Sequence, residues 1–219
     1  MSQPASFPEL SLRSFSDLLA SAAPVPGGGS ASAVVASLGA SLLAMVARLS
    51  QGRERYAPFA GTVERALVAA DAARARLLEL ADEDAAAYRG LVEARAAARA
   101  RTPAHPGSDV AVQEAAREAA RVPMAIVREC YAVMDHVDRM AGRSNLGAAS
   151  DLDVAARLLE AGARGAGANV IVNLPAMGDE RLADSMLGEL EARTHELVSA
   201  VARIASQVRS QGLRPPETA

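Results

Sequence analysis

The stretch PVPGGGSASAVVASLGASLLAMVARL, residues 24–49, places a helix-length apolar segment directly after two prolines and three glycines. The segment carries no charge before Arg48, so we expect a helix that is buried around most of its circumference. Consecutive glycines are costly to order and bury no side chain. Gly27, Gly28 and Gly29 therefore form either a slack linker or a place where bare backbone is needed.

The composition of the 219 residues favours closely packed helices. Half of the residues are apolar, roughly a quarter are alanine, and aromatic residues make up only 3%. This balance supports a sizeable core made of helices rather than a sheet. We expect an all-α protein with a single domain over residues 1–219 and a core over about 10–211.

Hydrophobic periodicity and helix breakers set the expected elements. Helices are predicted over residues 11–22, 30–49, 61–100, 110–140 and 179–211, and over one further segment that begins at Ser150 or Asp151 and ends with NVIVNLP. The segment RTPAHPGSD, residues 101–109, separates the third helix from the fourth. Pro123 lies inside the fourth and predicts a kink or a lost hydrogen bond near Ala119.

Charge and residue usage argue against several classes of function. The net charge of −3 comes from dispersed acidic and basic residues, which argues against nucleic-acid binding. One cysteine and three scattered histidines offer no metal-ligand spacing, so we expect no metal. We find no signal-peptide pattern and no apolar run near the length of a membrane span, which predicts a cytoplasmic protein without membrane contact.

One carboxylate interrupts an apolar stripe of the third predicted helix. Leu77, Leu80 and Leu91 recur at helical spacing, and Asp84 falls on the same side, while Asp82 rotates toward a more polar side. Partial burial would raise the pKa of Asp84 and suit it to proton transfer. An aspartate bonded to an arginine or a helix end inside the core is an equally good interpretation.

Further polar residues stand beside apolar helices. Ser150 and Asp151 fit ordinary helix capping after the turn that holds Asn145. Asn169 and Asn173 are four residues apart, so their amides share a helix face, where they either pair in the core or bind a heterocycle. The arginines near the expected helix ends, either solvated or available to anions, are Arg48, Arg53, Arg55 and Arg143.

Four segments in this order resemble the cyclodeaminase/cyclohydrolase family, which includes the C-terminal domain of formiminotransferase-cyclodeaminase. They are the opening stretch, LADEDAAAYRGLVEA, ARVPMAI and SNLGAASDLDVAARLLEAGARGAGANVIVNL, and together they span about residues 10–205. The resemblance implies an elongated bundle of long antiparallel helices that forms a homodimer and acts on one-carbon derivatives of tetrahydrofolate.

Within that family the resemblance implies an enzyme, most simply a methenyltetrahydrofolate cyclohydrolase, a hydrolase that opens the 5,10-methenyl compound to 10-formyl-tetrahydrofolate. The alternatives are a formiminotetrahydrofolate cyclodeaminase, a lyase that closes the ring with loss of ammonia, and a folate-binding helical module without catalysis. The implied catalytic aspartate is Asp84 or Asp82, and the apolar stripe favours Asp84. The implied substrate-binding residues are Gly27, Gly28, Gly29, Ser30, Arg53, Asn145, Asp151, Asn169 and Asn173.

The sequence departs from the family pattern at three places. No formiminotransferase domain accompanies the 219 residues, which lowers the expectation of a cyclodeaminase. Where many relatives have a leucine-proline-lysine triplet, this chain has RARTPAHP, so Arg99 or Arg101 would have to replace the lysine. Ala149 stands where the bifunctional relatives have an arginine.

Overall fold

The computed structural model of the chain describes residues 6–101 and 110–217, and within these ranges it contains helices and no strand. The loop expected between the third and fourth long helices lies, from residue 102 on, outside the described residues. The helices are α1 (Leu12–Leu19), α2 (Gly28–Ser50), α3 (Ala60–Arg101), α4 (Val110–Met140), α5 (Ala149–Asn173) and α6 (Glu180–Ser210), with short 3₁₀ turns η1 (Phe7–Glu9), η2 (Glu54–Phe59), η4 (Leu146–Ala148) and η5 (Leu174–Ala176).

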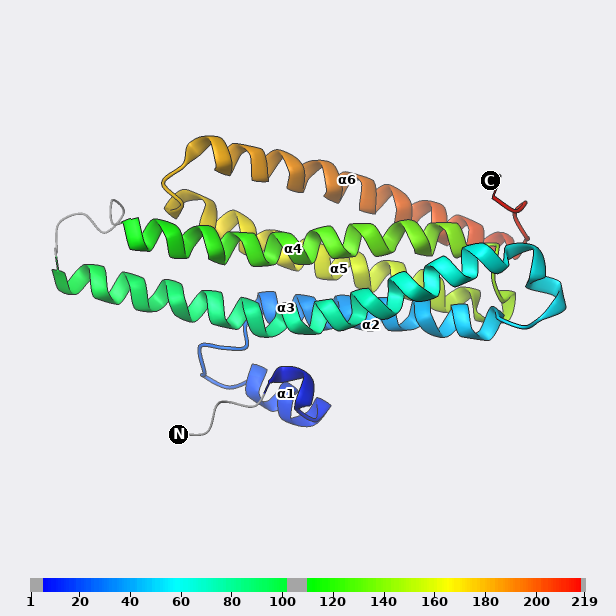
Figure 1. Ribbon diagram of the computed structural model, residues 1–219, viewed down its shortest axis with the longest axis horizontal. Coiled ribbons are helices and arrows are strands. Elements are labelled where there is room, and N and C mark those ends of the chain that lie inside the picture. The colour runs from blue at the N-terminus through cyan, green and yellow to red at the C-terminus, as the bar shows by residue number, and fades with distance from the viewer. Residues whose placement is uncertain (1–5, 102–109, 218–219) are drawn as a thin grey trace.

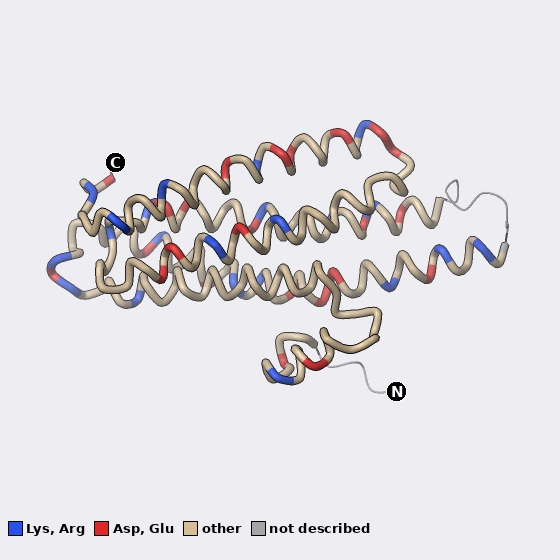
Figure 2. Tube along the Cα trace, turned by 180° about the vertical axis from the view of Figure 1, so that it is seen from behind, with Lys and Arg blue, Asp and Glu red and all other residues tan. Residues whose placement is uncertain are grey.

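Five long helices, α2 to α6, form an elongated bundle (Figure 1). α2 packs against α3 and α5, and α4 packs against the same two helices on the other side, while α6 lies along α4 and α5. The short helix α1 stands beside the bundle near the start of α2 (Figure 1). Acidic and basic residues alternate along the helices without a zone of one sign (Figure 2). The expected all-α bundle of long helices is confirmed.

Most helix ends lie within two residues of the expected positions, but α1 ends at Leu19 rather than at Ala22. α2 begins at Gly28, two residues earlier than expected, so two of the three glycines are helical. α5 begins at Ala149 without a side-chain cap, which corrects the expectation that Ser150 or Asp151 caps it. Asn145 caps the preceding turn instead, since its Oδ1 accepts a hydrogen bond from the Gly147 N–H at 3.0 Å.

Glycines allow α2 and α5 to approach closely. A Cβ at Gly39 would lie 2.9 Å from the Ala155 carbonyl oxygen, and one at Gly162 would lie 2.8 Å from the Ser32 carbonyl oxygen. Neither contact leaves room for a side chain, because both neighbours are backbone atoms. The two helices therefore pack with their backbones close together.

The hydropathy of α2 corrects one sequence expectation. Gly28–Ser50 is long and apolar enough to cross a membrane by length and composition, although the sequence was expected to contain no such run. Within the bundle, 61% of its most apolar window is buried. The core helix of a soluble bundle passes the same test, so this property alone does not indicate a membrane span.

Candidate active site

A cavity of about 260 Å³ lies where α2 begins, between α3, α4 and α5. α3 and α5 contribute polar side chains to it, and the start of α2 contributes bare backbone. Its lining residues are Pro24, Val25, Gly27, Gly28, Gly29, Asp84, Tyr88, Ala119, Asn169 and Asn173. Six of the expected site residues therefore lie together, although they come from distant parts of the chain.

Ser30 holds the Asp84 carboxyl group at the edge of this cavity. The Ser30 Oγ lies 3.1 Å from Asp84 Oδ2 and 2.9 Å from the carbonyl oxygen of Ala81. A hydroxyl has one proton to donate, so Ser30 donates to one of these acceptors at a time. When Ser30 donates to Ala81, its lone pair can accept a hydrogen bond from protonated Asp84, so the site accommodates both forms of the acid.

The surroundings of Asp84 favour its protonated form. Burial is the main cause and raises the pKa of Asp84 above the ordinary value of 3.8, while hydrogen bonds from the Ser30 hydroxyl and the Ser30 backbone partly oppose the shift. The neighbouring stripe residues Leu77, Leu80 and Leu91 are buried, as the helical spacing predicts. Asp84 is thus a carboxyl group in an apolar stripe that opens on a cavity.

Gly29 explains why the chain needs bare backbone at the start of α2. A Cβ at Gly29 would lie 2.1 Å from Asp84 Oδ1 and 2.5 Å from its Cγ, so any side chain there would displace the carboxyl group. A Cβ at Gly28 would meet Asn169 Nδ2 at 3.5 Å, an ordinary contact. The linker interpretation of the glycines is wrong, because Gly28 and Gly29 form the first turn of α2 against Asp84 and Asn169.

The two asparagines are fixed by backbone carbonyls. Asn173 Nδ2 donates to the Ala119 carbonyl at 3.0 Å and to the Asn169 carbonyl at 2.9 Å, and Asn169 Nδ2 donates to Gly165 at 2.9 Å. Pro123 has no N–H for the carbonyl four residues earlier, which is Ala119. The hydrogen bond that Pro123 removes from α4 is thus replaced by an amide of α5. Both asparagines line the cavity, and each amide oxygen can still accept a hydrogen bond.

Asp82, the other aspartate considered for catalysis, does not line the cavity. Its carboxylate accepts hydrogen bonds from the Ser6 hydroxyl and from the Phe7 N–H, the latter at 2.9 Å. It ties η1 to α3 and so positions the segment that precedes the glycines. Glu83 likewise turns outward and forms an ion pair with Arg76. This geometry favours Asp84 over Asp82, as the apolar stripe does.

Three expected site residues lie far from the cavity in one chain. Arg53, Asn145 and Asp151 are near the C-terminal end of α2, whereas the cavity is at its start. Arg53 follows the C-terminus of α2, whose 23 residues span about 35 Å. Asn145 is held beside the same end, where its N–H donates to Ser50 Oγ at 2.9 Å. The expectation that all three join the glycines in one site is not met within a single chain.

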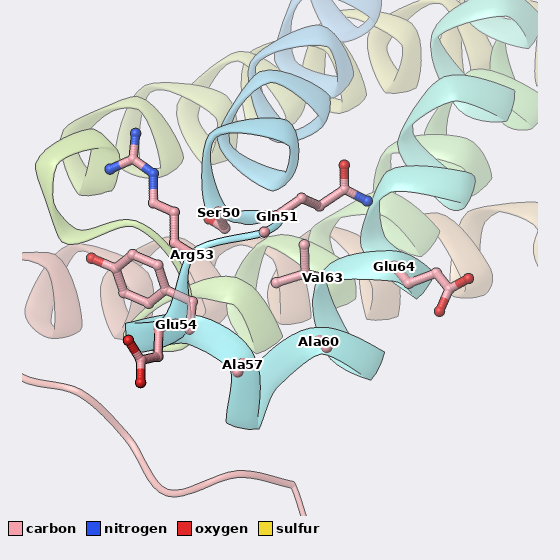
Figure 3. A pocket seen from close by; sticks show the side chains of 10 residues that line it. Ser50, Gln51, Arg53, Glu54, Ala57, Ala60, Val63 and Glu64 are labelled. Atoms are coloured by element: carbon pink, nitrogen blue, oxygen red, sulfur yellow. The ribbon is translucent and has the colours of Figure 1, made fainter.

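A second cavity of about 540 Å³ lies at this far end. Arg53 and Glu54 project to different sides of the turn that follows α2 (Figure 3). Within residues 6–101 and 110–217, the Arg53 guanidinium has no hydrogen bond or ion pair. The residues that line this cavity are Ser50, Gln51, Gly52, Arg53, Glu54, Tyr56, Ala57, Ala60, Val63 and Glu64.

Residues 11–192 match the family model described as formiminotransferase-cyclodeaminase. The chain belongs to this family. A methenyltetrahydrofolate cyclohydrolase of Methylorubrum extorquens is 32% identical over 91% of this chain and 96% of its own length. The formimidoyltransferase-cyclodeaminase of Mus musculus is 33% identical over 88% of this chain, which spans only 34% of that protein.

A solved structure has the same fold. The formiminotetrahydrofolate cyclodeaminase of Thermotoga maritima superposes with a TM-score of 0.84 at 30% identity, over 93% of this chain and 98% of that one. The formiminotransferase-cyclodeaminase family thus includes proteins of this size as well as proteins about two and a half times as long. The resemblance expected from the four sequence segments is confirmed.

Four cavity residues were not expected as site residues. Tyr88 lies four residues after Asp84 on the same helix face, and this spacing could have identified it. Ala119 contributes through its carbonyl group, which the position of Pro123 could have identified. Pro24 and Val25 carry no chemical signal in the sequence, because they line the cavity only through the path of the chain before α2.

Proposed function

We propose that the chain is a tetrahydrofolate one-carbon enzyme, most directly a methenyltetrahydrofolate cyclohydrolase, with Asp84 as its general acid and base. The observation that carries this proposal is the buried carboxyl group of Asp84, with its raised pKa, at the edge of a cavity at the start of α2. The likeness to the Methylorubrum protein over nearly the whole of both chains supports the cyclohydrolase assignment.

The reaction needs one proton to move twice. The Asp84 carboxylate takes a proton from the water that attacks the methenyl carbon between N5 and N10. The bond from that carbon to N5 then breaks, and protonated Asp84 returns this proton to N5. The second proton of the water leaves the new hydroxyl group for solvent as the formyl C=O forms on N10, and its release balances the positive charge of the methenyl compound. Ser30 hydrogen-bonds Asp84 in both states, donating to the carboxylate and accepting from the acid.

The amides and the glycine backbone would bind the ring system. Asn169 and Asn173 are held by backbone carbonyls, so their oxygens are positioned before substrate binds. The first N–H groups of α2 have no helical partners, and Gly28 and Gly29 let a polar heterocycle approach them closely. In this proposal Tyr88 covers the ring system from the α3 side.

A formiminotetrahydrofolate cyclodeaminase is the second candidate, because the Thermotoga structure carries that name at 30% identity. The formimino group would react in its protonated form, N5–CH=NH2+. The same aspartate would take a proton from N10 as that nitrogen attacks the formimino carbon, and would pass it to the NH2 group, which leaves as ammonia and gives the methenyl cation. The proposal also includes a homodimer in the cytoplasm, with no metal in the reaction.

The decisive experiment incubates the wild type separately with the methenyl and the formimino compounds and follows methenyl absorbance. Loss of methenyl absorbance supports the cyclohydrolase, and a gain from the formimino compound supports the cyclodeaminase. The Asp84→Asn variant must lose the activity that the wild type shows. Tight folate binding without turnover of either compound by the wild type would overturn both assignments in favour of a binding module.

A further inference from the structure

One side of α3 packs against α2 and continues past the start of α2. On this side the Ala81 carbonyl accepts a hydrogen bond from the Ser30 hydroxyl at 2.9 Å, and Asp84 follows about one turn later. α2 begins at Gly28, whereas α3 runs on to Arg101. Figure 1 shows this last part of α3 beside α4 and beyond the start of α2. α2 therefore covers this side of α3 only about as far as Asp84.

Four side chains continue this side of α3 at helical spacing, and we call them the α3 ledge. They are Tyr88, Val92, Arg95 and Arg99, which follow Asp84 by four, eight, eleven and fifteen residues. Tyr88 and Val92 are each 45% exposed, so the first half of the ledge presents apolar surface to solvent. The ledge begins at the cavity, which Tyr88 also lines, and leads away from it along α3.

The second half of the α3 ledge is positively charged. Residues 88–100 contain three arginines, Arg89, Arg95 and Arg99, and one acidic residue, Glu93. Glu93 follows Asp84 by about two and a half turns, so it projects from the opposite side of α3. Among the residues that the structure describes, Arg95 and Arg99 have neither a hydrogen bond nor an ion pair. Their guanidinium groups are therefore available to an anion.

The cavity next to the ledge holds only part of a folate; this step rests on the proposed folate substrate. Its volume of about 260 Å³ is below the roughly 300 Å³ at which ligand pockets begin, and none of its described lining residues is positively charged. The methenyl carbon must reach Asp84, which places the ring system in the cavity. The aminobenzoyl-glutamate group, which is attached at N10, then has to extend past the rim, and its carboxylates need cations outside the cavity.

The spacing along α3 fits this group. At a rise of about 1.5 Å per residue, Arg95 lies roughly 16 Å and Arg99 roughly 22 Å beyond Asp84. Side chains of a helix tilt toward its N-terminus, so both arginines lean back toward the cavity, and an extended arginine reaches about 6 Å. About 10 Å thus separates Asp84 from the guanidinium group of Arg95. The ring, amide and carbon chain of aminobenzoyl-glutamate place its two carboxylates about 9–12 Å from N10.

The order of chemical groups along the ledge also matches. The aminobenzoyl ring is flat and apolar and comes first after N10, as Tyr88 and Val92 come first after Asp84. The carboxylates come last, as the arginines do. We propose that the α3 ledge binds the aminobenzoyl-glutamate group, with the ring beside Tyr88 and Val92 and the carboxylates at Arg95. Arg99, about one turn further along, adds positive charge at that end.

The first test compares two substrates that differ only at the glutamate: methenyl-tetrahydrofolate and an analogue in which a neutral methylamide replaces glutamate. Arg95→Ala should raise KM for the glutamate compound about tenfold with little change in kcat, because a charge-assisted contact is lost. KM for the methylamide should not change. Arg99→Ala should raise KM for the glutamate compound by about two- to threefold, since Arg99 acts from a longer distance.

Two variants separate a direct contact from an effect on folding. Arg89→Ala removes an arginine of the same stretch from a different side of α3 and should change KM for neither compound. Arg95→Lys keeps the charge and should recover part of the affinity that Arg95→Ala loses. An equal increase of KM for both compounds in Arg95→Ala, or an unchanged KM for the glutamate compound, would overturn the proposal.

An added charge tests the ledge from its other half. Val92→Glu places a carboxylate at an exposed position between the ring and the arginines, so helical circular dichroism should not change. This variant should raise KM for the glutamate compound more than for the methylamide, because like charges repel. Ala97→Glu, at an exposed position on the opposite side of α3, is the matched control and should affect neither. Equal effects of Val92→Glu on the two compounds would contradict the proposed position of the carboxylates.

The second test is a binding measurement that does not depend on turnover. By isothermal titration calorimetry, the wild type should bind 5-formyl-tetrahydrofolate roughly tenfold more tightly than its methylamide analogue, and Arg95→Ala should abolish this ratio. Equal binding of both compounds by the wild type refutes the ledge even in an active cyclohydrolase. A wild type that keeps the ratio but turns over neither the methenyl nor the formimino compound refutes the proposed function and leaves the ledge in place. A wild type that binds neither compound refutes both.

Discussion

The carboxyl group of Asp84 occupies the space that a side chain on Gly29 would need, since a Cβ at that glycine would lie 2.1 Å from Asp84 Oδ1. α2 and α3 thus meet at a point where one residue contributes a functional group and the other contributes only backbone. This relationship makes the position of the acid depend on a glycine that is 55 residues away in the sequence.

Gly29→Ala should therefore displace Asp84. We expect a loss of about 1–3 kcal/mol in the free energy of unfolding, measured by urea titration, together with a loss of activity. Gly28→Ala is the matched control for folding and should change stability by less than about 0.5 kcal/mol, because its Cβ makes an ordinary contact. Adding Asp84→Ala to Gly29→Ala should restore stability but not activity. Full activity of Gly29→Ala alone would contradict the proposed role of Asp84.

Asp84→Asn should lower kcat roughly 10²- to 10⁴-fold, the usual effect of losing a general acid or base. Asp82→Asn should keep kcat near the wild-type value, because Asp82 holds the N-terminal segment and does not line the cavity. It should instead speed up proteolytic cleavage before α1, as loss of these hydrogen bonds costs about 1 kcal/mol. A reversed pattern would assign catalysis to Asp82.

The stability of the protein should depend on pH through Asp84. Because burial raises the pKa of Asp84 in the folded state, its favourable contribution is present below the ordinary pKa of 3.8 and is lost as pH rises through the raised pKa. Asp84→Asn removes the buried charge, so its melting temperature should exceed that of the wild type at pH 7. The difference should shrink as pH approaches 4, and a wild type that is more stable than Asp84→Asn at pH 7 would refute the burial effect.

The same pKa should govern the rate. If the Asp84 carboxylate accepts the proton from water, kcat/KM should rise with pH through a raised carboxyl pKa and then level off. Ser30→Ala removes a hydrogen bond that lowers this pKa, so the rising limb should move to higher pH. An unchanged limb in Ser30→Ala would mean that another group sets the profile.

The contribution to stability of the hydrogen bond from Asn173 to the Ala119 carbonyl should depend on whether residue 123 is proline. Asn173→Ala leaves the Ala119 carbonyl without a donor and should cost about 1–3 kcal/mol of stability. In a Pro123→Ala background, residue 123 has an N–H for that carbonyl, so the same Asn173 change should cost less. A double-mutant cycle on urea unfolding measures the difference, and additive effects would show that the asparagine does not replace the lost helical bond.

The sequence predicted the long helices closely because their periodicity and breakers are local signals. α4 has the expected bounds Val110–Met140, and Asp179 caps α6 through the Leu182 N–H as such residues do. The start of α5 was predicted less well, since Ser150 and Asp151 have capping chemistry but Asn145 reaches a backbone N–H first. Capping preferences alone do not predict which of several nearby polar side chains will reach a free backbone N–H group.

Only part of the candidate site was predicted correctly from the sequence. Asp84, the glycines and the two asparagines have a shared environment that helical spacing and family resemblance can indicate. Arg53 was grouped with them because it follows α2, yet the length of α2 places it about 35 Å from Gly28. Sequence order gives the distance along a helix, and that distance separates Arg53 from the cavity at the start of α2.

The Ser30 hydroxyl group has one proton and two possible acceptors, the Ala81 carbonyl and the Asp84 carboxylate. It can donate to either acceptor without moving a heavy atom. Turning about a single C–O bond lets the same side chain stabilise Asp84 as an anion or as an acid. In many enzymes the closing of a lid or a loop completes the site and limits turnover. In the proposed mechanism Asp84 changes between base and acid without such a motion, so the chemical step should be insensitive to solvent viscosity.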